Sequence, residues 1–163
     1  MAENYTGVFK HPGWPSRSLD EATSRGQLGL PIFTIDDDYG VKAYKYVLFG
    51  SNVTAGAALA FTDLYSRTVS TTHTNSLNRP AGVAIAAGTS GQYGVIQCYG
   101  YYATIATNGD DDIADDTTLI LGGSGTCDSV AAGTASTYRP LAIALAADVD
   151  ASNTVAGHLV CVF

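Results

Sequence analysis

The chain has 163 residues and a formal net charge of −7, and only 14% of its residues are charged, against about 25% in an ordinary soluble domain. Glutamate and lysine are especially scarce, which argues against a helical protein. The acidic balance argues against a nucleic-acid partner, because phosphate contacts need clustered Lys and Arg. No apolar run approaches the roughly 18 residues of a membrane span, so we expect no membrane partner.

Residues 1–27 differ in composition from the rest of the chain. They contain aromatic residues without a regular period, and their start has no apolar stretch of the kind found in a signal peptide. Capping-box spacing and a following glycine predict one short helix, Ser18 to Arg25. We interpret this segment as an arm that contacts a partner protein or a neighbouring copy through Tyr5, Phe9 and Trp14. The alternative is that it folds back over the body and caps an open end.

Beyond the arm, residues 28–163 have the composition of a single β domain. Short apolar runs rich in β-branched and aromatic residues alternate with polar, Gly-rich segments, which is typical of strands joined by turns. The predicted strands cover residues 32–36, 41–49, 57–61, 82–87, 94–107, 117–121, 141–147 and 157–163. Several are apolar on both faces, so the sequence predicts an all-β fold, a small β-barrel or a β-tulip or sandwich.

An internal pseudo-repeat with a period of about 60 residues runs through this domain. Residues 53–87 align without gaps on 113–147, so that Arg79-Pro80 falls on Arg139-Pro140. With three extra residues in the second copy, Cys98 matches Cys161, and the pseudo-repeats cover about 53–98 and 113–161. Coincidence in an alanine-rich chain is the alternative.

No catalytic constellation is recognisable. The histidines are His11, His73 and His158, and none lies in a known catalytic or metal-binding motif. We therefore predict no catalytic residue, no cofactor and no enzymatic activity. Cys98, Cys127 and Cys161 lack CxxC spacing and are expected to be reduced and buried.

The acidic run Asp110 to Asp116 has two interpretations. Converging carboxylates can bind Ca²⁺, but the spaced glycine and closing glutamate of an EF-hand are missing. A solvated hairpin loop is the favoured interpretation, so we predict no metal site. The tyrosines also leave two options, since Tyr99 and Tyr101 share a strand face, as do Tyr44 and Tyr46. Such faces serve in sugar platforms, but tyrosine is equally suited to a core or an interface.

Taken in order, these segments resemble a protein family. The series consists of Leu28-Gly29, an Asp-rich turn at 36–40, an aromatic strand ending in Tyr46-Val47, the stretch 53–59, and Arg79-Pro80 followed by 82–87. It resembles the head-decoration, or capsid cement, proteins of tailed phages over about residues 28–163.

The resemblance implies a β-barrel or β-tulip that trimerises at lattice three-fold points and clamps subunits of the major capsid protein, without catalysis or cofactor. Such a protein is made in the host cytoplasm and resides on the capsid surface of the virion. The alternative function is a receptor- or carbohydrate-binding β module of a phage fibre or surface protein.

Overall fold

The structure is a computed structural model that describes residues 28–63, 65–72, 79–109, 113–130, 139–147 and 153–161. These residues form ten strands and no helix, which confirms the all-β prediction. The predicted arm, with Tyr5, Phe9, Trp14 and the short helix, lies outside the described residues. No described helix is long and apolar enough to cross a membrane.

The strands follow the predicted apolar runs, with two additions. They are β1 (Pro31–Asp36), β2 (Gly40–Phe49), β3 (Ala58–Asp63), β4 (Thr68–Ser70), β5 (Pro80–Ala84), β6 (Tyr93–Ala106), β7 (Thr118–Leu121), β8 (Cys127–Ser129), β9 (Ala142–Ala144) and β10 (Thr154–Val160). The two strands that the sequence did not predict are the short β4 and β8. All ten belong to one sheet, in the order β1-β2-β4-β3-β5-β6-β10-β9-β7-β8.

The predicted hairpin of β1 and β2 is held by its own turn. The two strands pair antiparallel from Pro31 to Asp36, and Gly40 closes the turn with a positive φ of 74°. The Asp36 carboxylate accepts hydrogen bonds from the amides of Asp38 and Tyr39, both at 3.0 Å. A short aspartate side chain is suited to this role because it can reach the amides of the residues that follow it.

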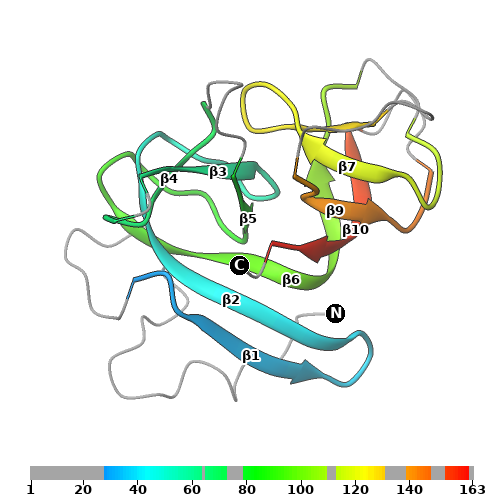
Figure 1. Cartoon of the computed structure of the whole chain (residues 1–163), viewed down its shortest axis with the longest axis horizontal. Coiled ribbons are helices and arrows are strands. Elements are labelled where there is room, and N and C mark those ends of the chain that lie inside the picture. Colours follow the sequence, from blue (N-terminus) through cyan, green and yellow to red (C-terminus); the bar gives the residue numbers. More distant parts are fainter. Residues whose placement is uncertain are drawn as a thin grey trace.

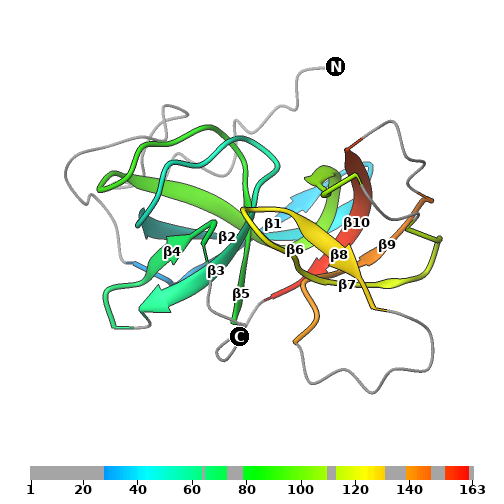
Figure 2. The same cartoon turned by 90° about the horizontal axis from the view of Figure 1, so that it is seen from above.

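Strand pairing divides the sheet into two lobes. In the first lobe, the pairings β2–β4, β4–β3, β3–β5, β5–β6 and β6–β2 form a closed ring. In the second lobe, β6, β10, β9, β7 and β8 pair in turn, and a parallel bridge from Thr107 to Cys127 joins the end of β6 to β8. Figure 1 shows the lobes at the left and right with β6 running from one to the other, and Figure 2 shows them side by side from above.

The lobes share a register that follows the predicted repeat. In the first lobe Ala58 of β3 faces Val83 of β5, and in the second lobe Thr118 of β7 faces Ile143 of β9. The alignment of 53–87 on 113–147 places Ala58 on Thr118 and Val83 on Ile143. The β3–β5 ladder thus has a counterpart in the β7–β9 ladder.

The next strand departs from the alignment. Gln97 of β6 faces Val83, and His158 of β10 faces Ile143, so these two residues occupy corresponding places. The alignment with three extra residues instead matched Cys98 with Cys161, which is two residues out of this register. A shift of two residues keeps the same side chains on the same face of a strand, so the apolar pattern alone does not reveal it.

Apolar side chains fill both lobes. Val47, Phe49, Leu59 and Ile96 pack in the first lobe, and the second is packed by Ile105, Ile113, Leu119, Leu141 and Leu159. Each side chain of this size contributes about 1.5–3 kcal/mol when it is fully buried. Cys98, Cys127 and Cys161 are buried and free, as the sequence predicted.

The tyrosines of β2 belong to the core. Tyr44 and Tyr46 are fully buried and pack with Val95 in a third cluster. Tyr46 also contacts the ring of Tyr93, with centroids 5.9 Å apart. Of the two interpretations of these tyrosines, burial in the core is the one observed, and a sugar platform on this face of β2 is excluded.

Candidate functional site

Of the three histidines considered for catalysis, the structure describes only His158. His158 of β10 lies edge-on against the ring of Tyr99, with centroids 5.1 Å apart. His11 and His73 lie outside the described residues. Within the described ranges, no group of three or more His, Cys, Asp and Glu side chains is placed to hold a metal ion.

Only part of the acidic run is described. Asp115 and Asp116 are exposed in the turn that precedes β7, and Asp116 has a positive φ of 59°. Asp110 to Asp112 lie outside the described residues. The described part of the run therefore lies in an exposed turn, and the prediction that no metal binds it stays a prediction.

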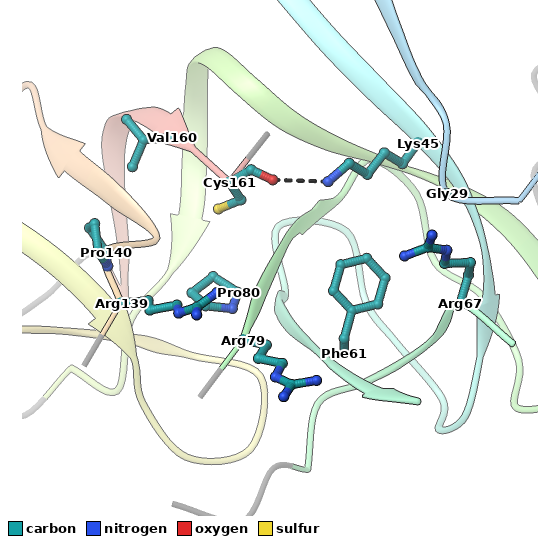
Figure 3. A pocket seen from close by; sticks show the side chains of 10 residues that line it. All are labelled: Gly29, Lys45, Phe61, Arg67, Arg79, Pro80, Arg139, Pro140, Val160 and Cys161. Carbon is teal, nitrogen blue, oxygen red and sulfur yellow. Dashed lines mark hydrogen bonds between the residues drawn. The ribbon is translucent and has the colours of Figure 1, made fainter. Parts of the chain in front are cut away.

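A pocket of about 600 Å³ lies between the two lobes. Figure 3 shows the side chains that surround it. They come from β2, β3, the turn before β4, the start of β5, the segment before β9 and the end of β10. The lining residues are Gly29, Lys45, Phe61, Arg67, Arg79, Pro80, Arg139, Pro140, Val160 and Cys161.

The pocket collects the positive charge of the described chain. Five lysines and arginines are described, and all but Lys42 line the pocket; the four that do are Lys45, Arg67, Arg79 and Arg139. Lys42 is instead paired with Asp36, at 2.9 Å between Nζ and Oδ2. No acidic side chain occurs among the described lining residues. This acidic protein thus gathers most of its described cations in a single cavity.

Lys45 forms the buried wall of the pocket. Its side chain starts from the middle of β2 and leaves only 4% of the residue exposed. The ammonium donates a hydrogen bond of 3.0 Å to the carbonyl of Cys161 and lies 5.6 Å from the centre of the Phe61 ring. Burial, together with the nearby charge of Arg67, lowers the pKa of Lys45 below its usual value of 10.5. The site therefore already favours an added negative charge.

Backbone geometry positions Arg67. This residue has a positive φ of 55°, in a turn where the Asp63 carboxylate accepts hydrogen bonds from the Tyr65 amide and the Ser66 hydroxyl. The Arg67 side chain passes over Gly29, where an added Cβ would lie 2.6 Å from its Cδ. The Arg67 side chain can therefore lie against the backbone of residue 29 only because this residue is a glycine.

A second feature of the surface is apolar. Leu30, Phe33, Ile35, Tyr39 and Val41 are exposed on the β1–β2 hairpin, and we call them the β1 surface. Ile35 is 83% exposed and Phe33 57%, and the two share one face of β1. β1 ends the sheet and pairs with β2 alone among the described strands. Exposed apolar edge strands are typical of sites that contact another chain.

The sequence analysis missed both features. It noted Arg79-Pro80 and Arg139-Pro140 only as matching positions of the repeat, and the structure brings both motifs to one cavity. The sequence signal was the scarcity of cations together with the repetition of Arg-Pro. The predicted contact residues Tyr5, Phe9 and Trp14 lie outside the described residues.

Comparison with known proteins yields a likeness of fold. No family model matches the chain, and no curated protein does. Among solved structures, the head fiber gp8.5 N base of bacteriophage phi29 is similar, with a TM-score of 0.51 and 18% sequence identity. The match covers 71% of this chain and 92% of that chain. At this identity the similarity concerns the fold alone.

Proposed function

We propose that the chain is a non-enzymatic structural protein of a tailed-phage virion that decorates and stabilises the capsid lattice. The observation that carries the proposal is the likeness of fold to the base of a phage head fibre, over 92% of that chain. The Gly-, Ala- and Arg-Pro-containing motifs that resemble decoration proteins support the same class from the sequence.

The β1 surface is the contact that we assign to this function. Five exposed apolar residues on an edge hairpin provide an area that a binding partner would remove from water. In this proposal the partner is the major capsid protein or a neighbouring copy within a trimer. From the sequence, we expect Tyr5, Phe9 and Trp14 of the arm to make intermolecular contacts as well.

Stabilisation then follows from mass action. A protein that binds the assembled lattice and not its dissociated subunits stabilises the lattice by RT ln(1 + [L]/Kd) per site, about 2.7 kcal/mol when its concentration is 100 times Kd. Because a shell repeats the site many times, a modest affinity per site is sufficient.

A fibre module is the second candidate, and two observations favour it. The first is that the similar structure is named a head fiber N base. The rings of Tyr39 and Tyr101 stack at 4.1 Å between centroids, and Tyr39 is half exposed on the turn between β1 and β2. The exposed part of the Tyr39 ring is the surface on which a sugar ring would stack in this candidate.

Co-sedimentation separates the two candidates. Heads that lack the protein are mixed with the purified chain, sedimented, and tested for release of DNA on heating. Decoration predicts saturable binding and a higher temperature of DNA release. A fibre module predicts binding to heads without that thermal effect, together with binding to a glycan array that is lost in Tyr39→Ala. Failure to bind heads would contradict both.

A further inference from the structure

We propose that the cationic pocket between the lobes binds an acidic peptide segment of another protein, whose carboxylates lie on Arg67, Arg79 and Arg139. The proposal goes beyond the proposed function, because peptide binding by the purified chain can be measured whether or not the chain is part of a capsid. It rests on the convergence of four cations, on their lack of acidic partners among the described residues, and on the apolar walls between them.

The charge distribution is the first argument. The chain has a net charge of −7, yet four of its five described cations face one cavity. Like charges gathered in a cavity repel one another, so the arrangement is destabilising until an anion enters. In Figure 3, Lys45 and Arg67 lie on one side of the Phe61 ring, and Arg79 and Arg139 lie on the other.

The second argument is unused donor capacity. Within the described ranges, no acidic side chain pairs with the guanidinium groups of Arg67, Arg79 and Arg139. Each guanidinium presents five N–H donors in a planar fork that matches a carboxylate, and such bidentate pairs are the stronger hydrogen bonds of proteins. Lys45 donates to the carbonyl of Cys161 and, with three N–H groups, has capacity for a further acceptor.

The third argument identifies the class of ligand. The walls between the cations are apolar, formed by Phe61, Pro80, Pro140 and Val160. A peptide combines carboxylates with apolar neighbours and fits such a mixed surface. A nucleic-acid strand carries a charge on every phosphate and would extend from the pocket over a protein surface that is otherwise acidic. The volume of about 600 Å³ lies within the range of roughly 300–1,000 Å³ of small-molecule pockets, so the pocket has room for a few peptide residues.

The test is a titration of the full chain into fluorescein-labelled hexaglutamate, followed by fluorescence anisotropy at low salt. We expect saturable binding by the native protein. The variant Arg79→Gln/Arg139→Gln should bind at least about tenfold more weakly, because it loses two charge-assisted contacts. Arg139→Lys keeps the charge and loses the fork, so its affinity should fall between the two.

The matched control is Arg17→Gln/Arg25→Gln, which removes the same charge from the N-terminal arm. Its affinity should stay within about twofold of the native value, because the pocket arginines and not the net charge of the chain hold the peptide. Circular dichroism and the melting temperature establish that each variant is folded. If the double pocket variant does not fold, Arg139→Gln, at an exposed residue, takes its place.

Three outcomes would overturn the proposal. The first is the absence of saturable binding to hexaglutamate. The second is an equal loss in the pocket variant and the charge-matched control, which would indicate net charge alone. The third is stronger competition by an oligothymidylate of equal charge, or by inorganic phosphate, than by unlabelled hexaglutamate, which would assign the pocket to a phosphate ligand.

Discussion

Gly56 and Asp116 occupy the same place in the two lobes. Both have a positive φ, 83° and 59°, and their amides donate hydrogen bonds to the carbonyls of Ala84 and Ala144 at 2.8 and 3.1 Å. The repeat that aligns β3 with β7 also aligns Gly56 with Asp116 and Ala84 with Ala144. We propose that the two lobes are copies of one ancestral unit.

The two positions should respond differently to substitution. A Cβ at Gly56 would meet the backbone carbonyl of Thr104 in a left-handed conformation, so Gly56→Ala should lower the free energy of unfolding by about 2–4 kcal/mol. Asp116 is exposed and aspartate tolerates this conformation, so Asp116→Gly should change it by less than about 1 kcal/mol. Urea unfolding measures both. Equal losses of unfolding free energy in the two variants would show that the close approach to Thr104 is not the reason why position 56 needs a glycine.

The thiols of Cys98 and Cys161 should resist alkylation in the folded protein. Burial raises the pKa of Cys98 to about 11 and that of Cys161 to about 12, whereas an unfolded thiol titrates near 9.0. At pH 9 an unfolded thiol is half ionised, while Cys98 is about 1% thiolate, and the thiolate is the reactive form.

Iodoacetamide labelling at pH 9, with mass spectrometry, provides the measurement. Both sites should remain unlabelled until urea is added. The raised pKa values also contribute to the free energy of unfolding below pH 9. This contribution is lost as the pH rises from 9 to 11, because only the unfolded thiols ionise in that range. Rapid labelling of the folded protein would contradict the burial of these residues.

The ion pair of Asp36 and Lys42 should contribute stability that is lost in acid. The hydrogen bond from Lys42 holds the pKa of Asp36 below 3.8, and the amides of Tyr39 and Asp38 act in the same direction. The contribution is therefore present above pH 3.8 and disappears as the pH falls through the lowered value. Asp36→Asn should be less stable by about 1 kcal/mol at pH 7, and the difference should narrow as the pH falls below 3.8. A difference that does not narrow in acid would assign the effect to the turn.

The β1 surface should serve in association and not in folding. Because Phe33 and Ile35 are largely exposed, Phe33→Ser/Ile35→Ser should change the free energy of unfolding by less than about 1 kcal/mol. The same variant should lose most of its self-association in analytical ultracentrifugation. Leu145→Ser, at a residue that is 45% exposed in the second lobe, is the control and should associate normally. If the double variant associates normally, the β1 surface is not the contact that we propose.

The long strands of the core were the easiest to predict from the sequence. β2 and β6 are long apolar runs, and burial of residues such as Phe49 and Ile96 explains why their pattern is visible. β4 and β8 are short and partly polar, and they exist because neighbouring strands offer them hydrogen bonds. Propensity within so short a segment does not reveal such strands, since tertiary pairing determines them.

The pocket could not be predicted for a related reason. Arg79 and Arg139 are far apart in the chain, and they meet because two lobes that share β6 lie side by side. No local period encodes the placement of one lobe against another. The repetition of Arg-Pro and the scarcity of cations were visible, but their convergence on Lys45 required the fold.

The most direct test of the proposed function is quantitative mass spectrometry of heads purified from the phage that encodes the chain. We predict that the chain is present in many copies per head, at a fixed ratio to the major capsid protein, and that heads from a deletion phage lack it and release DNA at a lower temperature. Heads that contain no copies, with the chain confined to the soluble part of the lysate, would contradict a structural role in the virion.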